Sequence, residues 1–143
     1  MTERQLAAKA YMDKYGDACR RVRQCEEQLE RENLSVDAIR SASDNDGMPH
    51  GSGISKPTED KAIRLADRAL RLTEARLEAI RIRQDVFDLI DSIDGIEGDV
   101  LYQRYIKLHK WEEVCVLLHY SWQGIHLIHR RALAIVESRL KCT

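Results

Sequence analysis

The stretch WEEVCVLLHYSWQGIHLIHRRALAIVESRL, residues Trp111–Leu140, decides how the rest of the chain is interpreted. It consists of two segments with apolar residues at helical spacing, separated by a short break from His119 to Ser121. Serine is a favoured N-cap residue, so the second helix is predicted to begin directly after Ser121. Two short helices joined by so tight a turn are typical of a helix-turn-helix.

The apolar positions of these segments predict which helix faces are buried. In the second segment they recur at i, i+3, i+7 and i+8, which is the spacing of one helix face. The predicted core face comprises Val114, Cys115 and Leu118 in the first segment and Ile125, Ile128, Ala132 and Leu133 in the second. The opposite face of the second segment is therefore expected to be free for a partner.

The side chains on that outward face have chemistry suited to DNA. In a helix-turn-helix, the first turns of the second helix reach base edges, and neighbouring basic residues bind phosphates. Glutamine can bond adenine, Trp and Leu can pack on a thymine methyl group, and glycine permits close approach. The predicted DNA-binding residues are Ser121, Trp122, Gln123, Gly124, His126, Leu127, Arg130 and Arg131. His129 is predicted to face phosphates together with the two arginines.

Other interpretations of these residues stay open. Trp122 could pack on Val100 or Leu101 instead of on DNA. His126 and His129 lie three residues apart and could share a metal ion, although no third ligand is visible. The two segments could also be an amphipathic helical pair with no role in DNA binding.

The distribution of charge agrees with DNA binding at one end of the chain. The formal net charge of the whole chain is -1. From Val114 onward the charged residues are Arg130, Arg131, Glu137, Arg139 and Lys141. Four basic and one acidic side chain make this end positive, so the remainder is net acidic.

Residues 1–94 are predicted to form a long antiparallel helical hairpin. Thr2 and Gln5 fit a capping box at the start of the first helix. Apolar or small residues then follow two rows at heptad spacing, which predicts a coiled-coil seam. These rows are Ala8, Tyr15, Val22, Leu29 and Val36, and Tyr11, Ala18, Cys25 and Ile39. A Gly/Ser/Pro loop at 42–57 connects this helix to a second long helix that begins near Thr58.

The second long helix has an apolar stripe wider than one seam needs. One row comprises Ile63, Ala66, Leu70, Leu77, Ile80 and Phe87, and the other Leu65, Ala69, Leu72, Val86, Leu89, Ile90 and Ile93. A stripe of this width predicts a second contact besides the first helix. That contact is predicted to be with a second subunit or with the C-terminal unit, and a homo-oligomer, with a dimer favoured, is the expected assembly.

The predicted fold class is all-α, with the hairpin at residues 1–94 followed by a helix-turn-helix DNA-binding domain at 95–143. Between them, Asp94 to Gly98 is predicted to be a hinge or tight turn, and Asp99 to cap the next helix. No nucleophile–base grouping, paired-carboxylate cleft or phosphate-binding loop is visible, so no enzyme, cofactor or metal is predicted. The chain shows no signal-like apolar run and no segment of membrane-spanning length, so we expect a cytoplasmic protein.

The C-terminal residues resemble the region-four DNA-binding domain of bacterial sigma factors. The resemblance is carried by Leu101-Tyr102-Gln103-Arg104-Tyr105-Ile106, Trp111-Glu112-Glu113-Val114-Cys115, Leu118, Tyr120-Ser121, Ile125, Ile128-His129 and Ala132-Leu133. Over nearly its whole length the chain is similar to the ArpU/RinA-type phage late transcriptional regulators, which also have a loop containing Gly-Met-Pro, here Gly47-Met48-Pro49. Two features depart from sigma region four: His119 replaces the usual glycine of the turn, and the second helix lacks a dense arginine pattern.

The resemblance implies a phage or prophage activator of late genes in a bacterial host cell. It implies double-stranded DNA as partner and RNA polymerase as a further candidate partner. Because His119 is not glycine, the turn is predicted to hold a non-glycine residue in a left-handed or otherwise strained conformation. Two other classes stay open: a DNA-recognising packaging component similar to a terminase small subunit, and a coiled-coil interaction protein that does not bind DNA.

Overall fold

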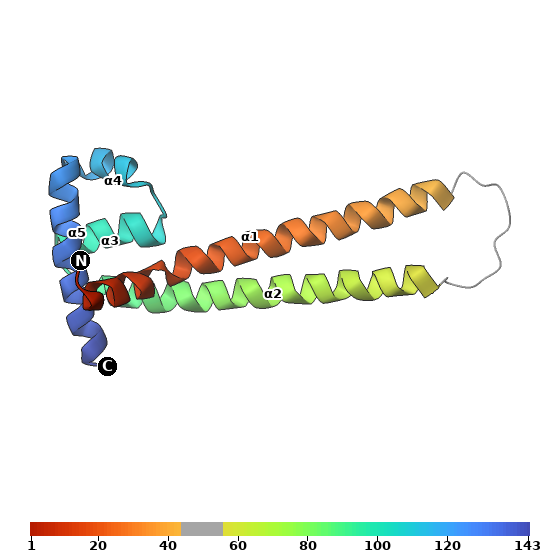
Figure 1. Cartoon of the computed structure of the whole chain (residues 1–143), viewed down its shortest axis with the longest axis horizontal. Helices are drawn as coiled ribbons and strands as arrows, with labels where there is room; N and C mark the ends of the chain where they lie inside the picture. Colours follow the sequence, from red (N-terminus) through yellow and green to blue (C-terminus); the bar gives the residue numbers. More distant parts are fainter. Residues whose placement is uncertain (44–55) are drawn as a thin grey trace. The chain divides into compact units, whose positions relative to one another are not determined.

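The computed structural model describes residues 1–43 and 56–143, with the side chains of 1–35 and 58–143. The elements, in chain order, are α1 (Glu3–Ser43), α2 (Lys56–Asp91), α3 (Ile96–Leu101), the π-helical segment η1 (Tyr102–Ile106), α4 (Trp111–Leu118) and α5 (Trp122–Lys141) (Figure 1). No strand occurs among the described residues, which confirms the all-α class. The predicted Gly/Ser/Pro loop falls almost entirely outside these residues, and Gly47-Met48-Pro49 does so completely. Within the described ranges, none of the helices combines the length and the apolar character needed to cross a bilayer.

The chain divides into two compact units. Unit 1 comprises Met1–Cys19 and Ala79–Thr143, and unit 2 comprises Arg20–Glu78. The start of α1 and the end of α2 therefore belong with α3, η1, α4 and α5, so both sides of the predicted boundary at 94/95 contribute to unit 1.

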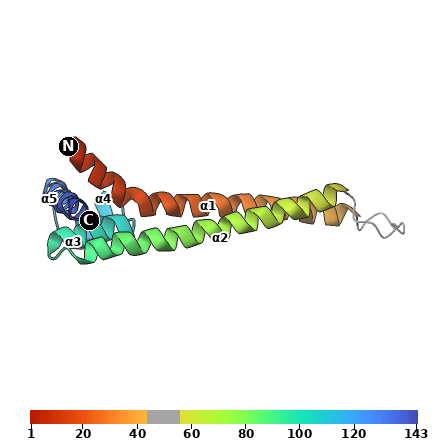
Figure 2. The same cartoon turned by 90° about the horizontal axis from the view of Figure 1, so that it is seen from below.

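In unit 2, α1 and α2 lie side by side (Figures 1 and 2). Arg76 forms an ion pair with Glu26 at 3.0 Å, and Arg68 Nη1 donates to Gln28 Oε1 at 2.8 Å. The later α1 residue therefore meets the earlier α2 residue, which is an antiparallel order. Of the two predicted rows of α2, the second includes the buried Leu72, whereas the first is left exposed in this unit.

The core of unit 1 draws on five elements. The buried residues of its main cluster include Ala8 and Met12 from α1, Val86 and Ile90 from α2, Leu101 from α3, Tyr105 and Ile106 from η1, and Ala132, Leu133 and Val136 from α5. Met12 is fully buried, although it lies on neither predicted seam row. A second cluster joins Val100 of α3 to α4 and α5. The beginning of the chain therefore shares one core with the end of α2, α3, η1 and α5.

The connection from α2 to α3 depends on two glycines. Gly95 has φ 82°, a left-handed conformation that glycine adopts without strain. Gly98 lies inside α3, where a Cβ would overlap with the carbonyl oxygen of Ile93. The prediction that Asp99 caps the next helix is wrong, because α3 begins at Ile96 and includes Asp99. The sequence does not show this early start because α3 begins without any side-chain cap.

Candidate nucleic-acid interface

The turn between α4 and α5 has the geometry that its sequence predicts. His119 adopts φ 58° and ψ 44°, so a non-glycine residue does occupy the left-handed region. Ser121 is the N-cap of α5, and its Oγ accepts a hydrogen bond from the Gly124 backbone N–H at 3.1 Å. Both predictions for the turn are confirmed.

Replacing His119 by glycine should stabilise the protein. A non-glycine side chain in the left-handed region costs roughly 1–2 kcal/mol of stability, which glycine would avoid. Glycine also makes the unfolded chain more flexible, which offsets part of that stabilisation. We therefore expect His119→Gly to raise the free energy of unfolding by up to roughly 1 kcal/mol, measured by urea denaturation. His109→Gly is the control, because His109 has no positive φ, and it should lower stability. A His119→Gly variant no more stable than the wild-type protein would contradict the prediction.

The packing of α4 against α5 agrees with the predicted core face. Val114 of α4 and Ile125 and Ile128 of α5 are buried in one cluster with Val100. Ala132 and Leu133 are buried as well, in the main cluster. Ile125, Ile128, Ala132 and Leu133 therefore lie on the inner face of α5. The other side chains of its first turns lie on the outer face.

Five of the predicted DNA-binding residues gather around one hollow on that outer face. The hollow has a volume of about 440 Å³ and is lined by Trp122, Gln123, His126, Leu127 and Arg130. Trp122 and Leu127 are 52% and 60% exposed, so large apolar side chains are displayed to solvent here. An apolar surface with an amide and a guanidinium group at hand is suited to base edges and phosphates.

The other predicted residues have different places. Arg131 pairs with Glu97 at 3.5 Å and does not line the hollow. A Cβ on Gly124 would lie 3.1 Å from Ser121 Oγ, so the glycine has a role in the turn itself. His129 is only 4% exposed, and the prediction that it faces phosphates is wrong.

His129 is instead part of a buried polar pair. Its Nε2 and the Tyr105 hydroxyl are hydrogen-bonded at 2.7 Å. Burial, with smaller contributions from the charges of His126, Lys9 and Arg104, lowers the pKa of His129 to about 4. Burial also raises the pKa of Tyr105. Both groups are therefore neutral at physiological pH, and their hydrogen bond satisfies the two polar atoms inside the core.

A set of edge-to-face and tilted ring contacts connects this buried pair to the hollow. The Trp122 ring lies 4.6 Å from His126, with an interplanar angle of 67°. The Trp111 ring lies 4.8 Å from His126 and 4.6 Å from His129. The guanidinium of Arg104 lies 4.9 Å from the centre of the Trp111 ring. Trp122 thus lies against His126 and remains half exposed.

Arg104 and Trp111 are site residues that sequence reasoning missed. Trp111 begins α4 and Arg104 lies in η1, so neither belongs to the helix that carries the hollow. Trp122 and His126 lie four residues apart on one helix, a spacing from which the contact between their rings could have been predicted. The contacts that follow it are tertiary and have no local pattern.

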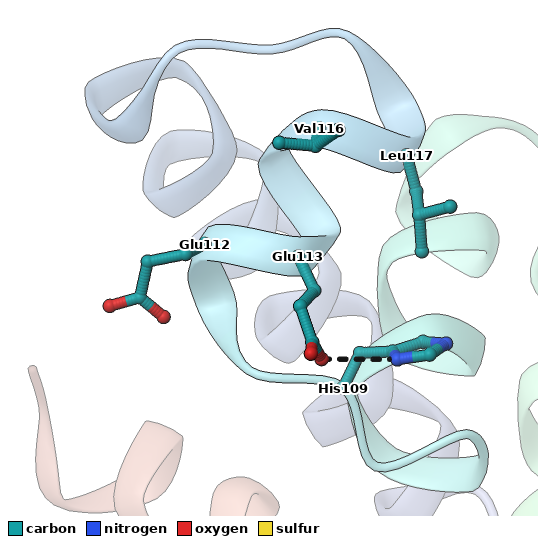
Figure 3. Close-up of a pocket in the computed structure, with 5 residues that line it drawn as sticks. All are labelled: His109, Glu112, Glu113, Val116 and Leu117. Atoms are coloured by element: carbon teal, nitrogen blue, oxygen red, sulfur yellow. Dashed lines mark hydrogen bonds and ion pairs between the residues drawn. The ribbon is translucent and has the colours of Figure 1, made fainter.

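A second hollow, of about 450 Å³, lies along α4 (Figure 3). Its apolar part is formed by Val116 and Leu117, which are 74% and 50% exposed. Glu113, on its rim, accepts hydrogen bonds from the Lys110 backbone N–H at 2.9 Å and from His109 Nδ1 at 3.2 Å. The backbone hydrogen bond is the main reason that the pKa of Glu113 is lowered. An ionised carboxylate on the rim makes this hollow unsuited to phosphate.

The two hollows of the α4–α5 region therefore differ in charge: Arg130 lines the one on α5, and acidic residues line the one on α4. Only the α5 hollow has the charge expected of a nucleic-acid interface. In comparisons with known proteins, no family model, curated protein or solved structure matches the chain.

Proposed function

We propose that this protein is a transcription regulator of a phage or prophage, which binds double-stranded DNA through a helix-turn-helix formed by α4 and α5. The observation that carries the proposal is the convergence of Trp122, Gln123, His126, Leu127 and Arg130 on one exposed hollow. This hollow lies on the first turns of the second helix, which is the part that docks in the major groove in such motifs. Activation of late genes in a bacterial cytoplasm is what the resemblance to ArpU/RinA-type regulators adds.

The chemistry of binding is divided among these side chains. Gln123 can donate to and accept from an adenine edge, and Arg130 can bind a phosphate oxygen. Within residues 1–35 and 58–143 the Arg130 side chain is in no ion pair, whereas Arg131 is paired with Glu97. Arg130 is therefore the stronger candidate for a phosphate contact. Regulation would occur by recruitment of RNA polymerase, which requires no catalytic group on this protein.

Substitution of the two arginines tests this division. Arg130→Ala should weaken DNA binding and reduce the slope of log K against log salt by about 0.9, the value for one phosphate contact. Arg131→Ala should have a smaller effect, because this side chain must give up Glu97 to reach a phosphate. Binding is measured by fluorescence anisotropy of a labelled duplex at several salt concentrations.

Arg21→Ala is the control, because Arg21 is an exposed arginine of α1 in unit 2. It should leave both affinity and salt slope unchanged. Absence of DNA binding at low salt, or an Arg130→Ala variant indistinguishable from Arg21→Ala, would overturn the proposal.

The same proposal includes a dimer formed through α2. In unit 2 the row Ile63, Leu70 and Leu77 has the spacing of one coiled-coil position, and these side chains are 62%, 57% and 62% exposed. Paired copies of a regulator commonly bind paired DNA half-sites, which is consistent with such a surface.

Sedimentation at micromolar protein should give the mass of a dimer for the wild-type chain and of a monomer for Leu70→Glu. Leu34→Glu is the matched control, because Leu34 is an exposed leucine of α1 outside the row. A monomeric wild-type protein, or a dimer unaffected by Leu70→Glu, would contradict this part of the proposal.

A further inference from the structure

We propose that the hollow on α5 receives the C5-methyl group of a thymine, and that His126 is a positioning residue that holds Trp122 as one wall of this methyl site. The inference rests on the proposed DNA binding and names the chemical group that the hollow recognises. It also assigns a role to Arg104 and Trp111, which do not line the hollow.

The Trp122 side chain lies against a neighbouring ring in the absence of DNA. Its indole is half exposed, and the ring lies against that of His126 with the two ring centroids 4.6 Å apart. Aromatic rings at such centroid distances attract one another beyond their burial of apolar area. The indole is therefore held in place before any ligand arrives, which lowers the ordering cost of binding.

The His126 side chain is itself supported by a second ring. The imidazole lies against Trp111 at 4.8 Å. Trp111 is in turn held by the cation–π contact with Arg104, whose Nη1 donates to the His109 carbonyl oxygen at 2.8 Å. These contacts connect the wall of the hollow to η1 and α4, so the exposed Trp122 is supported by two further elements.

The side chains that line the hollow match the groups of an A·T base pair. The thymine methyl is the only apolar group that base edges present in the major groove. Trp122 and Leu127 supply apolar surface, and Gln123 beside them can bond the adenine paired with that thymine. A cytosine has only a hydrogen at C5, so it would leave the apolar side chains of Trp122 and Leu127 without the methyl group.

The test uses deoxyuridine, which differs from thymidine by the methyl group alone. The wild-type protein is first used to select a duplex from random DNA. Each thymine of the selected site is then replaced by deoxyuridine in turn, and affinity is measured by anisotropy. At one thymine of each half-site the replacement should weaken wild-type binding by about fourfold, the value for burial of one methyl-sized group.

Variants then separate the methyl site from general binding. In Trp122→Ala and His126→Ala the effect of deoxyuridine should disappear, while the salt slope stays at its wild-type value. His126→Phe keeps an aromatic ring against both indoles and should retain the effect. Arg130→Ala should bind more weakly and also retain it. Circular dichroism establishes that each variant is folded, and Trp122→Ala replaces an exposed side chain and is expected to fold.

The possible results have distinct meanings. If the protein binds DNA but deoxyuridine has no effect at any position, the methyl site is wrong and the proposed function stands. If deoxyuridine weakens binding equally in wild-type and His126→Ala, the positioning role of His126 is wrong. If the protein selects no DNA at all, the proposed function fails and the inference fails with it.

Discussion

Replacement of Gly98 by alanine is expected to destabilise unit 1 strongly. A Cβ at this position would overlap with the carbonyl oxygen of Ile93 and would lie 3.7 Å from that of Ile90. Ile93 cannot easily move aside, because its side chain is buried and its backbone N–H donates to the Ile90 carbonyl oxygen at 2.9 Å. Overpacking of a core lowers the free energy of unfolding by up to about 3 kcal/mol. The better helix propensity of alanine offsets about 1 kcal/mol of this loss.

The net loss in the free energy of unfolding is therefore roughly 2 kcal/mol, measured by urea denaturation. Gly16→Ala is the matched control, because Gly16 is also helical but its Cβ would meet only the Leu108 side chain at 3.5 Å, an ordinary contact. This variant should be more stable than wild type by up to about 1 kcal/mol. Changes of the same sign in both variants would contradict the account of the α2–α3 connection.

Acidification should produce the second large effect, through His129. Its pKa is 6.5 in the unfolded chain and about 4 in the folded protein, because the charged form would be buried. Between these values the unfolded state binds a proton that the folded state does not, so stability falls as the pH decreases from about 6.5 to about 4. The total loss is roughly 3 kcal/mol, and above pH 6.5 this contribution is constant.

The measurement is the free energy of unfolding as a function of pH for wild type and His129→Gln. The variant keeps a hydrogen-bonding partner for Tyr105 but has no titrating group, so its stability should decrease less over this range. His119→Gln serves as the control, since His119 is an exposed histidine away from His129, and this variant should lose stability on acidification as the wild type does. Parallel curves for wild type and His129→Gln would show that His129 is not the group responsible.

Local rules predicted the parts of this protein that depend on neighbouring residues. The Ser121 cap and the left-handed His119 follow from residue type and position in the turn, because both conformations are determined within a few residues. The burial of Ile125, Ile128 and Leu133 follows from helical periodicity. The Thr2–Gln5 capping box is also present, with the Thr2 N–H donating to Gln5 Oε1 at 3.2 Å.

Contacts between distant residues could not be predicted in this way. His129 lies four residues after Ile125, on the buried face, but its polarity suggested an outward position. Its burial becomes favourable only because Tyr105, twenty-four residues earlier, supplies a hydrogen bond. The sequence also could not show which of the two apolar rows of α2 is buried, because Leu70 and Leu72 are equally apolar. Only the fold distinguishes the exposed row from the buried one.

The most direct test of DNA binding through α5 is selection of random duplex DNA by the purified protein, followed by sequencing. The wild-type chain should enrich one motif that contains an A·T pair, and Gln123→Ala should lose the preference at a single position of that motif. Equal recovery of all sequences by the wild-type protein, or an identical motif with Gln123→Ala, would contradict the assignment of the α5 hollow as the base-recognising surface.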